Sequence, residues 1–299
     1  MQDVTKDREK YIGGSDIAAI LNISKFKTRW QLLKEKAGIE ESDFSGNVYT
    51  EYGNELEPKI REYVNAELDH HFIEGKVIDD YLRYHADGVD FNDECVLEIK
   101  TTSDIHDDIW DYKHYLCQLL MGMWMYNYKR GILAVYHRPD DFNKNFDPDR
   151  LQIFTIRYEQ FEEFWKEIFS EIKRFREDWL KLMENPFMTE EEFQPKEIVE
   201  IADKVLILES QIEIYKQIEK EYKDAKASLK AGMEKYNIKT WTTPGGTKIT
   251  LVPDGEQTTE KKFNEKQFKE DNPELYERYC EDVTKKGKAG YVRITAGSK

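Results

Sequence analysis

The feature that most constrains the fold is a pair of apolar runs between residues 81 and 102, separated by a short polar turn. The first run reads YLRYHADGVDF and the second CVLEIKTT, and their β-branched and aromatic content is typical of strands. Asn92 and Asp93 are the best candidates for the turn. If they form the loop, the runs pair as a hairpin in which Asp87 lies directly opposite Glu98. Such a pairing determines both faces of the sheet, because successive side chains of a strand alternate between them.

This hairpin would bring three charged side chains to one face. Lys100 is two residues beyond Glu98 and projects from the same face, whereas Leu97 and Ile99 project from the other face into the core. The Cβ atoms of facing residues lie about 4.5–5.5 Å apart, so the carboxylates of Asp87 and Glu98 would repel each other. A divalent cation such as Mg²⁺, which prefers oxygen ligands, would relieve this repulsion. With Lys100 orienting a water or stabilising charge on a phosphate, the set indicates metal-assisted phosphodiester hydrolysis.

Two other interpretations of these residues stay open. Asp87 and Glu98 would form a surface salt-bridge cluster if they paired with Lys100 and Arg83 in solvent. A register shifted by one residue would place the two acids on opposite faces and undo the pairing.

Composition narrows the class of protein. The 299 residues suffice for one large domain with an accessory piece, and 39% of them are hydrophobic, which can supply a core. No apolar run approaches the roughly 20 residues of a membrane span, and the N-terminus MQDVTKDREK has no hydrophobic signal core, so we expect a cytoplasmic protein. The three cysteines form no CxxC pair, which supports neither a disulfide framework nor a cysteine-ligated metal. The net charge of −15 argues against coating nucleic acid by bulk attraction, although residues 1–36 carry a local excess of three positive charges.

The order of the predicted elements indicates a mixed α/β domain up to about residue 185. Amphipathic or capped stretches predict helices, and alternating or apolar runs predict strands. The helices are expected within residues 13–26, 29–38, 54–68, 110–127 and 159–183, and the strands at 72–78, 81–91, 95–102, 130–139 and 150–158.

The remainder is predicted to form a C-terminal extension. The Pro- and Glu-rich segment 184–195 is typical of a linker, so we place one domain at 1–188 and the extension at 189–299. A helix from about 195 to 236 has apolar residues near heptad spacing, interrupted by Glu219. A hairpin around residues 244–246, a helix over 265–283, a basic turn and a short strand at 291–295 follow. A coiled-coil scaffold built on the long helix would leave the first 185 residues unexplained.

Four blocks in order across residues 8–180 resemble the phage-type alkaline exonucleases, the lambda exonuclease and YqaJ-like viral recombinase group of the PD-(D/E)xK nuclease superfamily. The blocks are YIGGSDIAAILNISKFKTRWQLLKEKAG, GNELEPKIREYV, ADG followed by LEIKTT, and KHYLCQLLMGMWMY. The resemblance implies an α/β, restriction-endonuclease-like core with a central mixed sheet flanked by helices, here followed by a helical extension and hairpin. It implies Mg²⁺, which Mn²⁺ can replace, and 5′-to-3′ digestion of duplex DNA ends in phage or prophage recombination, leaving 3′ single strands. It further implies a single-strand annealing protein as partner and a trimeric ring around the DNA.

The resemblance also assigns the metal site. It implies that Asp87, Glu98, Glu57 and the backbone carbonyl of Ile99 are metal ligands, and that Lys100 is the catalytic lysine. An ordinary structural role stays open for Glu57, as an acid in the first turn of its helix.

The remaining assignments concern DNA. Gln118 resembles the family's active-site glutamine, and Arg8 and Ser15 resemble the arginine and serine that hold the 5′-phosphate. Tyr115, on nearly the same helix face as Gln118, and Thr101, next to the lysine, are candidate DNA contacts. The structural alternatives are a core amide for Gln118, an N-cap for Ser15 and a solvated side chain for Arg8.

Two alternative functions stay open. A structure-specific endonuclease of the same superfamily would nick closed circular DNA, which an enzyme that needs an end would spare. A non-catalytic DNA- or partner-binding module would have no need of the complete charged set.

Overall fold

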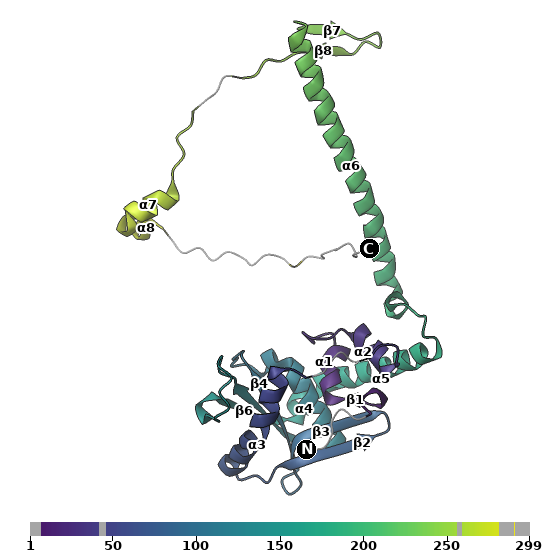
Figure 1. The fold of residues 1–299 in the computed structure, drawn as a ribbon, viewed down its shortest axis with the longest axis vertical. Helices are drawn as coiled ribbons and strands as arrows, with labels where there is room; N and C mark the ends of the chain where they lie inside the picture. Colours follow the sequence, from purple (N-terminus) through teal and green to yellow (C-terminus); the bar gives the residue numbers. More distant parts are fainter. Residues whose placement is uncertain (1–6, 42–45, 256–258, 281–289, 291–299) are drawn as a thin grey trace. The chain divides into compact units, whose positions relative to one another are not determined.

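The computed structural model describes residues 7–41, 46–255, 259–280 and 290 (Figure 1). The chain divides into two compact units, Met1–Leu206 and Ile207–Lys299. The domain boundary expected after residue 188 stays a prediction.

The first unit is built on a six-stranded mixed sheet. Its strands are β1 (Ile12–Gly13), β2 (Ile73–Asp79), β3 (Leu82–Asp90), β4 (Cys95–Thr102), β5 (Arg130–His137) and β6 (Leu151–Arg157). Their order is β1-β3-β4-β5-β6, with β2 paired to β3 in addition. The pairs β1·β3 and β4·β5 are parallel, and the others are antiparallel. The predicted fold class, a central mixed sheet flanked by helices, is therefore confirmed.

Helices cover both faces of this sheet (Figure 1). The α-helices are α1 (Ile17–Ile20), α2 (Arg29–Lys36), α3 (Val48–Leu68), α4 (Lys113–Tyr126) and α5 (Glu162–Glu184). Single 3₁₀ turns are η1 (Arg8–Lys10), η2 (Gly14–Asp16), η3 (Ile109–Tyr112), η4 (Pro148–Arg150), η5 (Tyr158–Phe161) and η6 (Glu190–Phe193). α3 packs its buried stripe on one face, against Leu97 and Ile99 of β4. α1, α2, α4 and α5 share the core on the other face.

The helix α3 is longer than its sequence pattern predicts. It begins at Val48 rather than near residue 54, because the side chain of Asn47 accepts hydrogen bonds from the N–H groups of Tyr49 and Thr50. The apolar residues Leu56, Ile60 and Val64, which indicate a helix in the sequence, lie in its later turns.

The predicted register of the β3–β4 hairpin is confirmed. Gly88 pairs with Leu97, and Asp90 pairs with Cys95. The connecting loop has the four residues Phe91–Glu94 instead of two, and Glu94 takes a left-handed φ of 49°. Asp90 closes the loop by accepting hydrogen bonds from backbone N–H groups within it.

Past residue 195 the chain forms α6 (Lys196–Lys235), the hairpin β7 (Thr240–Thr242) and β8 (Lys248–Thr250), and two short helices. The prediction of one helix over 265–283 is wrong, because α7 (Glu265–Asp271) and α8 (Pro273–Tyr279) are separate. Pro273 lacks an N–H and disfavours helical geometry at Asn272, which adopts φ −138° and ψ 61°. The predicted basic turn (Lys285, Lys286 and Lys288) and the strand at 291–295 lie outside the described residues. Within the described parts of the chain, none of the helices has the length and apolar character that a membrane span needs.

Candidate active site

The strand β3 has different neighbours at its two ends. β2 runs along one edge of β3. On the other edge, β1 pairs with Leu82 and Arg83, whereas β4 pairs with residues 88–90. Residues 84–87 therefore face a gap in the hydrogen-bond ladder, and side chains join the strands there.

A β-bulge determines the direction of Asp87. Asp87 and Gly88 together oppose one residue of β2, Glu74, and a bulge of this kind bends a strand and redirects its side chains. Oδ2 of Asp87 accepts a hydrogen bond from the N–H of Ile99 at 2.7 Å. The carboxylate thus satisfies a backbone donor of β4 beyond the point where β3 and β4 separate.

Glu98 is fully buried, at 0% exposure, and both of its carboxylate oxygens have a partner. The hydroxyl of Tyr84 donates to Oε2, and the ammonium of Lys100 donates to Oε1. The alternative of a surface salt-bridge cluster is wrong, because Glu98 has no access to solvent. Arg83 is also buried, with its guanidinium 5.3 Å from the ring centroid of Tyr11.

Glu57 reaches the same region from α3. Its Oε1 accepts a hydrogen bond from Nη1 of Arg61 at 3.0 Å, and the same nitrogen donates to the backbone carbonyl of Asp87. Nη2 of Arg61 binds Glu74 at 2.9 Å. Arg61 therefore connects α3 to β2 and β3 and holds Glu57 beside Asp87. Since α3 begins at Val48, Glu57 is not in its first turn, and that alternative is wrong.

Burial and mutual repulsion shape the protonation of this cluster. Burial raises the pKa of Glu98 to about 7, although the charge of Lys100 opposes the shift. Burial and the nearby Asp87 raise the pKa of Glu57 to about 7, and burial raises the pKa of Asp87. Burial alone would lower the pKa of Lys100, but the charges of Glu98 and Asp87 outweigh it and raise that pKa. Lys100 therefore stays charged at neutral pH.

This donor set fits a hard divalent cation. Asp87, Glu98 and Glu57 offer carboxylate oxygens, and burial raises the pKa of each of them, a shift that a bound cation would oppose. Mg²⁺ binds through oxygen ligands and commonly uses one or two carboxylates together with water and substrate phosphate.

Gln118 lies in α4, half-buried, near the turn that precedes α1. A Cβ atom placed on Gly14 would be 2.9 Å from Cγ of Gln118 and 2.9 Å from Cδ2 of Tyr84, so Gly14 permits close contact. The Gln118 amide makes no hydrogen bond to another described residue, which leaves it available to a ligand. Tyr115, one turn earlier in α4, is half-buried and stacks on Tyr112 at a centroid distance of 6.1 Å.

Thr101 follows Lys100 on β4 and faces α3, where its Oγ1 would lie 3.5 Å from a Cβ atom placed on Gly53. It is half-buried. Thr101 and Tyr115 therefore belong to opposite faces of the sheet.

Arg8 and Ser15 are in contact, as their predicted shared role requires. Nη2 of Arg8 donates to Oγ of Ser15 at 3.1 Å. Both residues line a cavity of about 490 Å³, together with Lys27, which is paired with Glu35. Position 15 is also not the N-cap of α1, which is Asp16.

A buried ion pair supports the floor of this cavity. Nζ of Lys36 lies 2.7 Å from Oδ2 of Asp16 and donates to the backbone carbonyls of Arg8 and Tyr11 at 2.8 and 2.6 Å. Burial alone would raise the pKa of Asp16, but the charges of Lys36 and Arg8 outweigh it and lower that pKa. The segment that carries Arg8 is thereby fixed to α2.

The structure also reveals residues that sequence reasoning missed. No sequence pattern indicates that Tyr84 belongs to the site, because only packing brings its hydroxyl to Glu98. Arg61 is four residues after Glu57, a helical spacing that indicates an ion pair. Phe26 lines the Arg8 cavity, is 94% exposed, and follows a turn in which Oγ of Ser24 accepts its backbone N–H.

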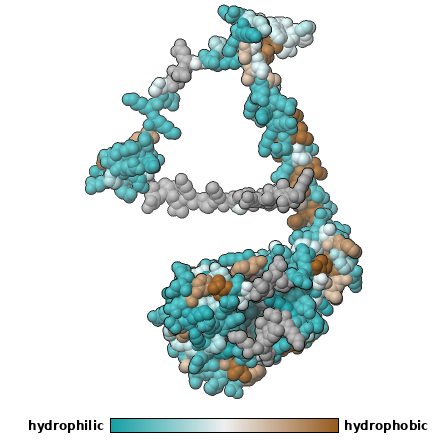
Figure 2. Space-filling view, viewed as in Figure 1, coloured by the Kyte–Doolittle hydropathy of each residue, from teal (hydrophilic) through white to brown (hydrophobic). Residues whose placement is uncertain are grey.

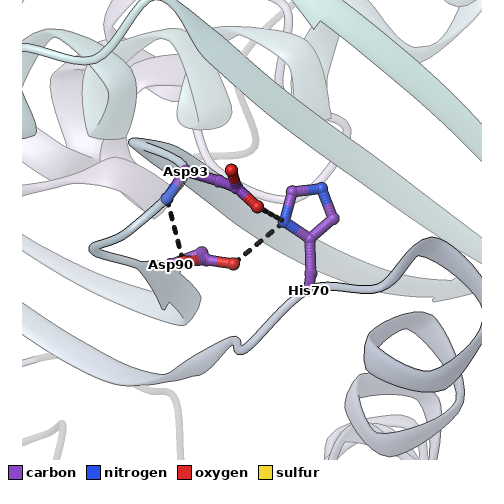
Figure 3. A group of neighbouring side chains, drawn as sticks. All are labelled: His70, Asp90 and Asp93. Atoms are coloured by element: carbon purple, nitrogen blue, oxygen red, sulfur yellow. Dashed lines mark hydrogen bonds and ion pairs between the residues drawn. The ribbon is translucent and has the colours of Figure 1, made fainter.

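A second group of metal-ligating side chain types lies at the far end of the hairpin (Figure 3), formed by His70, Asp90 and Asp93. Nδ1 of His70 is 3.0 Å from Oδ2 of Asp90 and 3.3 Å from Oδ2 of Asp93. Burial alone would raise the pKa of Asp90, but hydrogen bonds from His71, His70, Asp93 and Asn92 hold it well below its usual range. Asp90 is thus fully engaged in closing the loop, so we assign this group to the hairpin structure.

Residues 4–129 match the family model of the YqaJ-like viral recombinase domain. The matched range includes Glu57, Asp87, Glu98, Lys100 and Gln118, and the resemblance inferred from the sequence is confirmed. A search among curated proteins finds no match to the sequence.

Solved structures also resemble this chain. A crystal structure of a phage-related exonuclease from Haemophilus somnus 129PT is 15% identical, with a TM-score of 0.48 over 58% of this chain and 95% of that chain. An alkaline exonuclease from Laribacter hongkongensis is 18% identical, with a TM-score of 0.44 over 59% of this chain and 91% of that chain. Its complex with dAMP has a TM-score of 0.46 at the same identity and coverage.

Proposed function

We propose that this chain is a metal-dependent deoxyribonuclease that digests duplex DNA from a 5′ end and leaves a 3′ single strand. The observation that carries the proposal is the meeting of Asp87, Glu98 and Lys100 at the gap between β3 and β4, with Glu57 held beside them. Buried carboxylates next to a charged lysine suit phosphodiester hydrolysis.

Asp87, Glu98, Glu57 and the carbonyl of Ile99 would hold the metal, for which Mg²⁺ is the proposed ion and Mn²⁺ its substitute. When bound, the metal polarises the phosphodiester and lowers the pKa of a water. Neighbouring side chains would hold the proposed metal ligands in position. Tyr84 fixes the Glu98 carboxylate, and Arg61 fixes Glu57 against β3.

Lys100 is proposed as the catalytic lysine. Its ammonium stays charged and sits where it can stabilise negative charge that develops on a phosphate. The Gln118 amide, which is unpaired among the described residues, is proposed to bind a phosphate oxygen or a water. Tyr115 and Thr101 are proposed to contact the DNA from the two sides of β4.

Arg8 and Ser15 are proposed to bind the 5′-phosphate. A guanidinium can bind a phosphate through two parallel hydrogen bonds, and the hydroxyl adds a further donor. Lys36 holds the backbone of this segment, so the pocket is arranged before DNA binds. We therefore expect the enzyme to prefer a duplex with a phosphorylated 5′ end.

The biological setting is proposed on the family match. Enzymes of this type would work at double-stranded ends in phage recombination, in the cytoplasm of a bacterial host, with a single-strand annealing protein as partner and in a trimeric ring. The second candidate, a structure-specific endonuclease, would use the same metal site but would not need the Arg8 pocket.

The test compares DNA substrates in Mg²⁺. Linear duplex with a 5′-phosphate, the same duplex without it, and closed circular duplex are incubated with the wild type and with Lys100→Ala. We expect the phosphorylated duplex to shorten from its 5′ end, the circle to survive, and Lys100→Ala to be inactive. The matched control is Lys166→Ala, an exposed lysine of α5, which should retain full activity.

Other outcomes would change the assignment. Nicking of the circle would favour the endonuclease. Absence of cleavage in both Mg²⁺ and Mn²⁺ would refute the nuclease and leave a binding module. Arg8→Ala should abolish the preference for the 5′-phosphate while hydrolysis of the other substrate continues; equal loss on both substrates would contradict the pocket assignment.

A further inference from the structure

The long helix α6 carries an exposed apolar stripe. We call it the α6 seam, and its apolar members are Ile198, Ile201, Val205, Leu208, Ile212, Tyr215, Tyr222 and Leu229. Val205 is the least exposed of them, at 37%. Figure 2 shows apolar side chains in brown along this helix. A solvated helix is expected to bury such a stripe, since large contiguous apolar surfaces mark interaction sites.

The seam has the spacing of a two-stranded coiled coil. Positions separated by alternating steps of three and four residues continue from Ile198 to Tyr236, and all but two of them are apolar or aromatic. This is more than the three to four heptads, roughly, that indicate a coiled coil. Two seam positions are polar, Glu219 and Lys226, and they lie one heptad apart. The seam ends beyond Leu229, because Met233 is already buried.

We propose that α6 is a self-association surface, on which the α6 seam pairs in antiparallel orientation with α6 of a second copy of this chain. The proposal goes beyond the proposed nuclease function and does not depend on it. The seam is long enough to supply the affinity, since the stretch of α6 from Ile198 to Leu229 extends over nearly 50 Å, at about 1.5 Å per residue.

The two polar positions determine the orientation. In a parallel, in-register pair, each seam residue faces its own counterpart, so Glu219 would face Glu219 and Lys226 would face Lys226. Both contacts would set like charges against each other within the seam. In an antiparallel pair these residues face apolar residues of other heptads. Their flexible stems then cover the seam while their charged ends extend to water.

A third copy fits the seam less well than a second one. A parallel trimer would bring three acids together at position 219 and three lysines at position 226. In the antiparallel pair the seam complements itself, because the apolar half that begins at Ile198 lies along the half that contains the two charges.

The first test measures mass in solution. The full chain, of 35.6 kDa, should scatter light as an assembly of at least twice that mass. Ile212→Asp places a charge in the seam and should halve the mass. The control is Ile214→Asp, because Ile214 is similarly exposed (59% against 52%) but lies outside the seam. Far-UV circular dichroism of both variants shows whether α6 remains helical.

Three outcomes of this test would overturn the proposal. A monomeric wild type would mean that the seam is covered in another way. An unchanged mass for Ile212→Asp would place the association elsewhere in the chain. Equal loss in both variants would mean that more than one face of α6 is used.

The second test determines orientation. In a Cys280→Ser background, which removes the exposed cysteine, single cysteines are placed at Ile198 and Leu229. With the exposed seams fully overlapped, an antiparallel pair sets these two positions opposite each other. A short bismaleimide should then cross-link a mixture of the two variants but neither variant alone. Cross-linking of each variant with itself would refute the antiparallel orientation.

Discussion

Gly122 in α4 provides a sharp test of how the candidate active site is packed. A Cβ atom at this position would lie 2.3 Å from both Cε1 and Cζ of Tyr84, and 2.7 Å from its hydroxyl. Tyr84 is fully buried, and Gly14 contacts the same ring. The ring therefore has no free space to move into, and Gly122→Ala should displace it from Glu98.

The magnitude follows from two opposing effects. Carbon atoms pack at about 3.5–4.0 Å, so the ring must move by more than an ångström, and overpacking of this kind costs about 1–3 kcal/mol. Alanine is favoured over glycine inside a helix by about 1 kcal/mol. The net loss for Gly122→Ala should therefore be about 0–2 kcal/mol. Gly53→Ala in α3 is the matched control, because its Cβ atom would meet only Thr101 Oγ1, at 3.5 Å. It should gain up to about 1 kcal/mol.

Urea unfolding followed by tryptophan fluorescence is a suitable assay. Five of the six tryptophans lie within residues 1–206, so the signal reports mainly on the first unit. The two variants should differ in free energy of unfolding by about 1–3 kcal/mol, although each replaces a helical glycine with alanine.

A double variant tests the cause. In a Tyr84→Leu background the ring is absent, so Gly122→Ala should become neutral or stabilising. The double variant should therefore be more stable than the sum of the two single losses predicts. A stability of Gly122→Ala equal to that of Gly53→Ala would refute the packing argument. An equal loss in the Tyr84→Leu background would show that Tyr84 is not the neighbour that matters.

Three further predictions concern ionised groups. In EDTA, stability should fall as the pH rises from about 4 to 7, because an unfolded Glu titrates near pH 4.3 or so whereas burial raises the pKa of Glu98 to about 7. The urea midpoints of Glu98→Gln should fall less over the same pH range. At pH 8, Mg²⁺ should stabilise only the wild type. Asp90→Ala should cost about 2 kcal/mol at pH 7 by removing the acceptor of loop N–H groups. Since the pKa of Asp90 is depressed in the folded wild type, the difference in stability between wild type and variant should shrink as the pH falls below about 4 in the same assay. A difference that stays constant with pH would contradict this prediction. Lys36→Ala should cost about 3–5 kcal/mol because it leaves the buried Asp16 charge poorly compensated. Lys10→Ala, at an exposed position, should leave the urea midpoint nearly unchanged. Similar unfolding midpoints for the two variants would exclude a structural role for the buried pair.

Local patterns predicted a large part of the first unit. The alternation in residues 81–102 and the turn residues between them predicted the register that pairs Gly88 with Leu97. The start of α3 was not predictable from its apolar stripe, because Asn47 caps a polar extension of the helix. The split of the last helix could have been predicted from Pro273, since proline commonly opens a helix and breaks a preceding one.

Some features of the candidate site were likewise predictable from the sequence, and others were not. The spacing of Glu98 and Lys100 indicated that both side chains share a face, and they do contact each other. The bulge at Asp87 was not visible in the sequence, because it depends on how β2 meets β3. The Arg8–Ser15 contact was expected only from family resemblance, and it depends on the buried Lys36, which no local pattern identifies.

The sequence by itself thus determined what depends on neighbours along the chain: the alternation of the strands, the hairpin register and the heptad repeat of α6. Only the tertiary structure decided the burial of Glu98, the contact of Tyr84 with Gly122 and the position of Glu57. These depend on residues far apart in the sequence, whose packing brings carboxylates out of water and so shifts their pKa values.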